Sequence, residues 1–226
     1  MGYIVYFIII MAVPLLVQIY LKKTYSTYLE VPASSGMTGA EAARKVLDDN
    51  GLYHVAVEEV RGHLSDHYDP RDKVVRLSSS NFHGTSIAAI SVGTHEVGHA
   101  IQDQVDYGPL RLRHSLVPVA NFGSSMSFFV ILAGMLLQSA NFILLGIFLM
   151  AAAVLFQVVT LPVEFNASSR ALTQMVSSGL IRNDEEGEAR KVLNAAALTY
   201  VAATLVAIAE LLRFVLMFIG MRNDEE

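Results

Sequence analysis

Long apolar stretches alternate with polar segments along the chain, and their lengths predict membrane-spanning helices. A helix of about 20 apolar residues is long enough to cross the ~30 Å hydrocarbon core of a bilayer. Four segments meet this requirement: 2–21, 117–137, 142–161 and 192–220. The second and third are separated only by residues 138–141, so we expect them to form an antiparallel helical hairpin.

The polar segment 22–116 has the shorter patterns of a small α+β domain. Thr38 and Glu41 have the spacing of a capping box, which predicts that a helix begins there. Two valine-rich stretches, 53–60 and 73–78, predict strands. An edge strand near an active site can align an extended peptide through main-chain hydrogen bonds, although a purely structural hairpin has the same pattern.

The stretch 86–104 predicts a helix that follows these strands. Apolar residues recur at turn spacing, no proline interrupts them, and either Ser86 or Thr85 can cap the first turn. The sequence Ser-Ile-Ala-Ala-Ile continues into a His-Glu-Val-Gly-His pentad. The chain therefore places an HExxH motif on a predicted helix.

The pentad is typical of a zinc site. On a helix, His95 and His99 lie one turn apart on one face, about 6 Å between Cβ atoms, so both imidazoles can reach one Zn²⁺ ion. Glu96 then lies beside the metal site as a general base. The alternative, a pair of buried histidines without a metal, accounts less well for two histidines that bracket a glutamate.

Composition supports a membrane protein and restricts the metal ligands. The chain is 53% hydrophobic and only 16% charged, which is too apolar for an ordinary soluble domain. The net charge of −5 comes without a basic block, so we expect no nucleic-acid partner. Cysteine is absent, so a metal must be held by His, Asp or Glu.

Charge also predicts the orientation in the membrane. Lys22-Lys23 directly follows the first span, which we interpret as an uncleaved anchor ending in the cytoplasm. The segments 22–116 and 162–191 are then cytoplasmic, while residues 138–141 and the tail 221–226 lie outside. With this orientation every Lys and Arg except Arg213 and Arg222 is cytoplasmic, in agreement with the positive-inside rule.

A catalytic zinc site needs a third ligand on the cytoplasmic side, and Glu164 follows the third span there. Pro162 is expected to open a new helical segment with Glu164 in its first turn. Alternatively, Glu164 is an interfacial carboxylate stabilised by the helix dipole. The remaining histidines are further candidates, with the two nearest in sequence first: His67, His83, His54, His63 and His114.

Several sequence blocks carry a resemblance to a known family. They are Ser-Asp-His-Tyr-Asp-Pro-Arg at 65–71, Arg-Leu-Ser at 76–78, Ala-Ala before His-Glu-Val-Gly-His-Ala, and Leu-Pro-Val-Glu-Phe-Asn-Ala-Ser-Ser-Arg-Ala at 161–171. In this order, between four spans, they resemble the YugP family of bacterial membrane zinc metallopeptidases over essentially the full length.

The resemblance implies a fold and a set of site residues. The fold is a mainly α membrane protein with about four transmembrane helices and a small zincin-like cytoplasmic α+β part. This part contains a short sheet and the HExxH helix. One zinc ion is held by His95, His99 and Glu164, and Glu96 is catalytic. The implied location is the bacterial inner (plasma) membrane, with a multi-pass chain and the active site facing the cytoplasm.

The residues around the ligands are less well defined. Gluzincins, including HtpX-like membrane proteases, typically carry an acidic residue four positions after the ligand glutamate, where this chain has Ser168. Asn166 or Asp69 is therefore expected to orient a zinc histidine. Four residues are candidates for the donor that stabilises the oxyanion: His67, Tyr68, Arg170 and Tyr200.

The sequence thus predicts an integral-membrane zinc metalloendopeptidase that hydrolyses peptide bonds by zinc-activated water, with Glu96 as general base. Its expected partners are a peptide or protein substrate, the lipid bilayer, and other membrane proteins or a homo-oligomer. By analogy with the family, the role is in membrane-protein quality control.

Three other interpretations compete. The first is a non-enzymatic zinc-stabilised scaffold or chaperone partner, in which a protein ligand closes the fourth zinc position. The second is an intramembrane protease, which fits worse because four polar residues follow the pentad: Gln102, Asp103, Gln104 and Asp106. The third is a transporter, which rests only on Glu210 and Arg213 in the fourth span. Their spacing favours a simple ion pair instead.

Overall fold

The computed structural model describes residues 2–223, which are mainly helical with one small sheet, as the sequence predicted. In chain order the elements are α1 (Gly2–Leu29), α2 (Gly39–Asp49), β1 (Ala56–Val60), β2 (His67–Asp69), β3 (Val74–Ser78), α3 (Ser79–His83), α4 (Ile87–Gln104), α5 (Gly108–Leu136), α6 (Ala140–Ser177) and α7 (Glu186–Asn223). They form two compact units. One contains the chain up to residue 107 together with residues 163–199, and the other contains residues 108–162 and the chain from residue 200.

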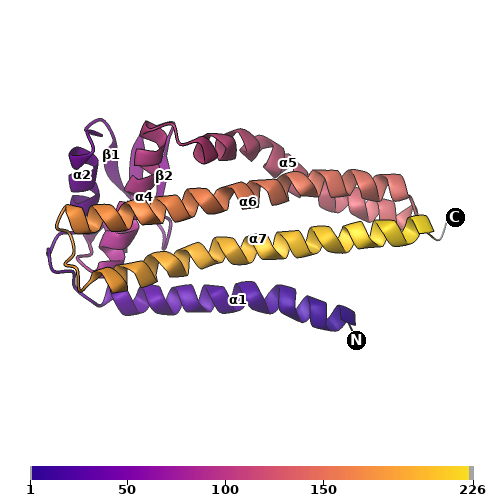
Figure 1. The fold of residues 1–226 in the computed structure, drawn as a ribbon, viewed down its shortest axis with the longest axis horizontal. Helices are drawn as coiled ribbons and strands as arrows, with labels where there is room; N and C mark the ends of the chain where they lie inside the picture. Colours follow the sequence, from indigo (N-terminus) through magenta and orange to yellow (C-terminus); the bar gives the residue numbers. More distant parts are fainter. Residues whose placement is uncertain (1, 224–226) are drawn as a thin grey trace. The chain divides into compact units, whose positions relative to one another are not determined.

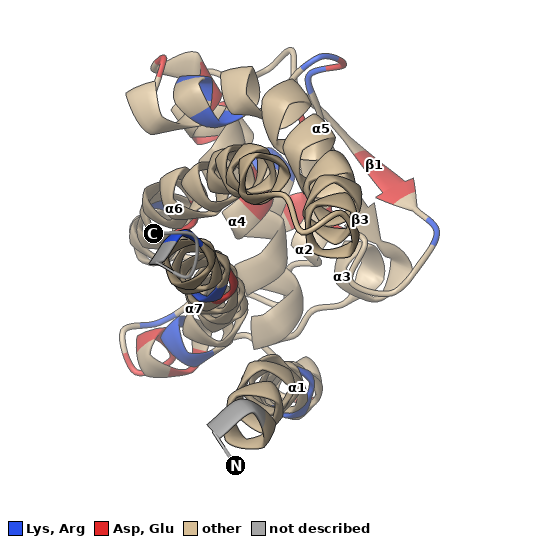
Figure 2. Cartoon of the chain, turned by 90° about the vertical axis from the view of Figure 1, so that its right-hand side faces the viewer, with Lys and Arg blue, Asp and Glu red and all other residues tan. Residues whose placement is uncertain are grey.

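Among the residues that the structure describes, four helices are long and apolar enough to cross a membrane, which confirms the predicted number of candidate spans. They are α1, α5, α6 and α7, and their ribbons are mostly free of charged residues (Figure 2). Along α1, large apolar side chains such as Ile8, Met11 and Leu15 are exposed. Such a continuous apolar surface is unfavourable in water and is expected where a helix faces lipid.

The helix α6 differs from the sequence expectation at Pro162. Instead of a new helix opening there, α6 continues through the proline to Ser177. Proline removes one main-chain hydrogen bond, a loss that membrane helices tolerate. Glu164 therefore lies well inside a helix rather than in a first turn, so the alternative in which a helix dipole stabilises its charge no longer applies.

The sheet of the first unit has three strands in the order β1-β3-β2. β1 pairs with β3 in parallel, and β2 pairs with β3 antiparallel. The two longer strands confirm the predicted ones, whereas β2 is too short to produce a recognisable alternation. The central strand β3 is the most buried, with Val75 and Leu77 fully enclosed.

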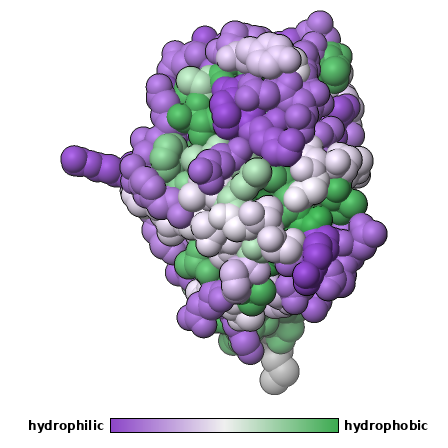
Figure 3. Space-filling model, turned by 90° about the vertical axis from the view of Figure 1, so that its left-hand side faces the viewer, coloured by the Kyte–Doolittle hydropathy of each residue, from purple (hydrophilic) through white to green (hydrophobic). Residues whose placement is uncertain are grey.

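The same unit contains a well-packed core between α2, the sheet and α4. The capping box is present: the Thr38 hydroxyl accepts a hydrogen bond from the Glu41 N–H, and the Thr38 N–H donates to the Glu41 carboxylate. Val46 and Leu47 are fully buried, and each stabilises the fold by roughly 1.5–3 kcal/mol. Figure 1 shows α2 and the small sheet beside α4, and the face of this unit seen in Figure 3 is mainly hydrophilic.

A buried carboxylate joins the sheet to the end of α4. Asp103 accepts hydrogen bonds from the Tyr68 hydroxyl, at 2.8 Å, and from the Lys73 ammonium group. Asp103 is only 4% exposed, so its charge needs these partners. The contact holds the edge strand β2 against the helix that carries the pentad.

Candidate metal centre

The helix α4 begins where the sequence predicted, because Ser86 caps it. The Ser86 hydroxyl accepts a hydrogen bond from the Ala89 N–H at 3.1 Å, and the helix then continues to Gln104. His95 and His99 therefore lie one turn apart on the same face. Their ring centroids are 4.9 Å apart, and the rings are nearly perpendicular, at 86°.

Gly98, between the two histidines, allows α6 to approach α4 closely. A Cβ atom at this position would lie 2.7 Å from the Ala167 carbonyl oxygen, well inside contact distance. Only the absence of a side chain permits this approach. Since Ala167 is one turn after Glu164 on α6, the glycine brings the third candidate ligand to the histidines.

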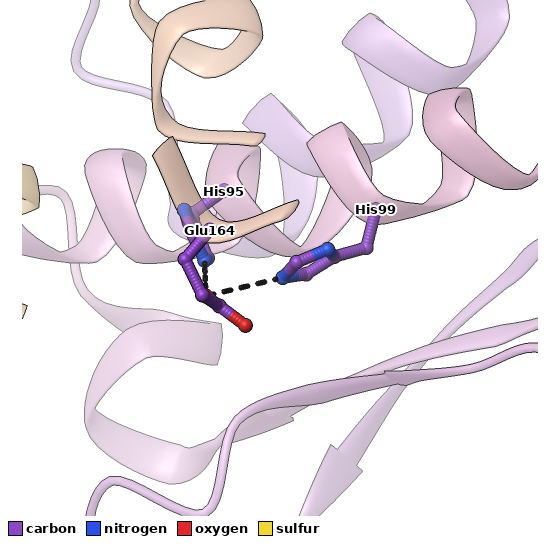
Figure 4. A group of neighbouring side chains, drawn as sticks. All are labelled: His95, His99 and Glu164. Carbon is purple, nitrogen blue, oxygen red and sulfur yellow. Dashed lines mark ion pairs between the residues drawn. The ribbon is translucent and has the colours of Figure 1, made fainter. Parts of the chain in front are cut away.

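The three candidate ligands converge on a common point, as Figure 4 shows. The Glu164 Oε2 atom lies 3.3 Å from His95 Nε2 and 3.6 Å from His99 Nε2. One potential ligand atom from each residue lies within 4.8 Å of the other two. Glu164 is 2% exposed, so its carboxylate is directed into the protein.

This arrangement fits zinc by donor type and by spacing. Two imidazole nitrogens and one carboxylate oxygen are a common set for catalytic zinc. Ligand atoms bonded tetrahedrally at about 2.0–2.2 Å from one ion lie about 3.4 Å from each other. The two nitrogen–oxygen distances agree with this value without rearrangement.

The other nitrogen of each imidazole has a neutral partner. His99 Nδ1 lies 3.0 Å from the Gln102 Oε1 atom, and His95 Nδ1 lies 3.2 Å from the Ser168 hydroxyl oxygen. Both partners are buried. Such contacts fix the orientation of each ring and leave Nε2 facing the metal position.

Glu96 is also buried, only 8% exposed, beside the two histidines. Burial raises the pKa of its carboxyl group above the ordinary value for glutamate. The charges of His95 and His99 oppose this shift, and the charge of Glu164 adds to it. The group is therefore poised to exchange a proton at a higher pH than an exposed glutamate.

The remaining predicted site residues fall into two groups. Asn166 and Arg170 on α6 hydrogen-bond to each other at 2.8 Å, and Asn166 also contacts Gln102. Three residues lie on β2 instead and contact other groups. His67 hydrogen-bonds to the Ser65 carbonyl, Tyr68 donates to Asp103, and Asp69 accepts from the Arg71 N–H.

The sequence did not predict the partners that hold the histidines. Ser168 was noted only as the position where an acidic residue is typical, and Gln102 was not considered. The spacing contained a signal, because Gln102 follows His99 by one turn and shares its helix face. An amide is nevertheless common on any helix, so residue type alone would not have identified it.

Comparisons with known proteins identify the family to which the chain is similar. Residues 3–219 match a family model described as "Putative neutral zinc metallopeptidase". The chain is 59% identical over 207 residues to a Bacillus subtilis (strain 168) protein named "Putative membrane protease YugP", and the alignment covers 92% of each chain. No solved structure matches the chain.

Proposed function

The chain belongs to the neutral zinc metallopeptidase family, and from this premise we propose that it is an integral-membrane zinc endopeptidase. In this proposal His95, His99 and Glu164 are the zinc ligands, and Glu96 is the general base. The active site faces the cytoplasm in the plasma membrane of a bacterium. The substrates are peptides or unfolded proteins, with membrane-protein quality control as the role.

One observation favours this proposal over the alternative of a non-enzymatic, zinc-stabilised scaffold. Within residues 2–223, the group of potential metal ligands at this position contains two histidines and one glutamate, without a fourth His, Asp or Glu. A structural zinc site is closed by four protein ligands, whereas a catalytic site keeps one position for water or substrate. Three ligands therefore favour catalysis.

The residues of the site have defined tasks in peptide hydrolysis. When bound, zinc supplies a Lewis acid that polarises the peptide carbonyl and makes water reactive near neutral pH. Glu96 accepts a proton from the attacking water and delivers it to the leaving amine. Burial raises the pKa of Glu96, which favours the first transfer, because a carboxylate of higher pKa is a stronger base toward the attacking water.

The sheet provides a place for the substrate backbone. β2 pairs with a neighbour on one side only, so its other edge can accept an extended peptide by main-chain hydrogen bonding. Asp103 holds β2 against α4 through Tyr68. This arrangement supports recognition of extended, unfolded segments rather than folded surfaces.

Metal removal tests the proposed function. Detergent-purified protein should cleave an unfolded model protein, lose this activity when zinc is stripped by a chelator, and regain it when zinc is restored at one ion per chain. Glu164→Gln should lower zinc content and activity together, while Glu186→Gln, an exchange of the same type distant from the ligands in sequence, should change neither. Cleavage that persists in zinc-free protein would contradict the proposal.

A further inference from the structure

A chain of hydrogen bonds lies behind His99 and ends at an arginine. Arg170 Nε donates to Asn166 Oδ1 at 2.8 Å, and Gln102 Nε2 donates to the same oxygen at 3.0 Å. Gln102 Nε2 also donates to the Val163 carbonyl oxygen at 2.8 Å. The Gln102 Oε1 atom then lies 3.0 Å from His99 Nδ1. We refer to Arg170, Asn166, Gln102 and His99 as the amide relay.

The direction of every bond in the amide relay follows from its two ends. An arginine side chain can only donate, so the Asn166 atom facing Arg170 must be its carbonyl oxygen. That oxygen and the Val163 carbonyl can only accept, so Gln102 must turn its NH₂ group toward them. Its own oxygen consequently faces His99 Nδ1, which must carry the hydrogen.

This polarity determines the state of the zinc-facing nitrogen. A neutral imidazole carries one hydrogen, and when Nδ1 holds it, Nε2 has a free lone pair. His99 Nε2 is the atom that lies 3.6 Å from Glu164. The chain of donors thus presents His99 to a metal in the only neutral form that can bind through Nε2.

We propose that Gln102 is a positioning residue that holds His99 in the Nδ1–H tautomer, with its own amide orientation set by Asn166 and Arg170. The proposal rests on the zinc site of the proposed function. In it, Asn166 and Arg170 act on His99 indirectly, by setting the orientation of the Gln102 amide. It also explains how two ligands on separate helices keep their spacing. Gln102 binds His99 on α4 and the carbonyl of Val163, the residue before Glu164 on α6.

Glutamine suits this position better than the carboxylate that commonly orients a zinc histidine. Gln102 is fully buried and uses its amide both as acceptor and as donor. A glutamate would keep the contact to His99, but its second oxygen would meet the Val163 and Asn166 oxygens without a hydrogen between them. We therefore expect Gln102→Glu to fail although the two side chains have the same shape.

Zinc affinity, measured by competition with a chromophoric chelator, is the first test. Gln102→Ala and Gln102→Glu should each weaken binding about 10–100-fold, the usual effect of removing a contact that orients a metal-bound histidine. Arg170→Ala, at a half-buried position that the fold tolerates more easily, should weaken it by up to about tenfold. Gln104→Ala is the matched control on the same helix, because Gln104 contacts the Asn50 carbonyl instead.

The tautomer itself is the second test, and a purely structural role for Gln102 would not alter it. In zinc-free protein with ¹⁵N-labelled histidine, at a pH where the ring is neutral, His99 should show the Nδ1–H signature. Gln102→Ala and Arg170→Ala should shift it toward a mixture of the two tautomers. An unchanged tautomer, or zinc affinity within twofold of the parent protein in Gln102→Ala, would overturn the proposal.

The two tests separate this inference from the proposed function. Neither readout depends on cleavage, and the tautomer is measured without zinc. If the parent protein fails to bind zinc but His99 is held as Nδ1–H, the zinc site fails and the amide relay stands. If zinc binds normally in every variant, the relay is wrong and the peptidase proposal is unaffected.

Discussion

Both histidines of the candidate metal centre contact neutral side chains. Ser168 contacts His95 and Gln102 contacts His99, where many zinc sites use a carboxylate that raises the basicity of the ring. Uncharged partners add no negative charge around a bound ion, so the ion keeps more of its own charge for a substrate carbonyl.

His99 should make zinc binding depend on pH. Burial alone would lower its pKa, but the hydrogen bond and negative charge of Glu164 outweigh burial and raise the pKa above its ordinary value of about 6.5. A proton and zinc compete for Nε2, so affinity should begin to fall at a pH above that value. Below it, affinity should fall about tenfold per pH unit.

Zinc dissociation constants, measured from mildly alkaline to mildly acidic pH with a calibrated chelator, check this dependence. Affinity that stays constant until well below the ordinary histidine pKa would show that Glu164 does not raise the pKa of His99 in the zinc-free protein.

The sequence predicted three candidate ligands that lie together in the structure, but not the side chains that support them; that the three bind zinc stays a prediction. The HExxH spacing identified His95 and His99, and the requirement for a ligand on the same side of the membrane selected Glu164, all of which the structure brings together. His67 and His83, also considered as ligands, are exposed and bond elsewhere. Gln102 was missed because its role depends on contacts with residues of α6, and only tertiary packing brings these residues close.

At the level of elements, the approach of α6 to α4 at Gly98 is the feature that assembles the site. Gly98→Ala would place a methyl group 2.7 Å from the Ala167 carbonyl oxygen. Such overpacking typically costs about 1–3 kcal/mol and would move Glu164 away from the histidines. We expect lower thermal stability and weaker zinc binding together, measured by a melting curve and chelator competition.

Gly187→Ala is the control for this substitution. Gly187 is also helical, and a Cβ atom there would meet nothing within 4 Å. Alanine at that position should leave zinc affinity unchanged and stabilise the helix slightly. If Gly98→Ala behaves like this control, α6 does not depend on the glycine for its approach.

Element boundaries show where local rules were overridden. The capping box at Thr38 and the cap at Ser86 were predicted correctly, because each depends on neighbouring residues. Pro162 was expected to begin a helix, yet α6 continues through it. The preference of proline for a first turn is statistical. It does not apply at Pro162, because the helix is stabilised on both sides of this residue.

At the scale of the whole molecule, the candidate spans and the positive-inside rule together define a testable topology. The metal ligands should lie on the cytoplasmic side, and the connection between α5 and α6 outside. The absence of cysteine makes this easy to examine, because a single introduced cysteine is the only thiol. Ser139→Cys should react with a membrane-impermeant maleimide on intact cells, whereas Ser177→Cys should react only after lysis.

The opposite labelling pattern would place the metal centre outside the cytoplasm. It would leave the chemistry intact but remove cytoplasmic proteins from the candidate substrates. The sequence predicts this orientation from charge asymmetry, which is a property of the chain as a whole, and the orientation stays a prediction. It could not predict the arrangement of side chains within each unit, which depends on contacts between distant residues.

The central claim, that this site hydrolyses peptide bonds with Glu96 as the base, is tested most directly by Glu96→Gln. The exchange keeps the shape of a buried side chain that is not among the three candidate ligands. Cleavage of an unfolded model protein and zinc content should be measured side by side in the parent and the variant. We expect one zinc per chain in both and cleavage reduced by at least about 10²–10⁴-fold in the variant, the usual contribution of general acid–base catalysis. Undiminished cleavage by Glu96→Gln with zinc bound would contradict the account.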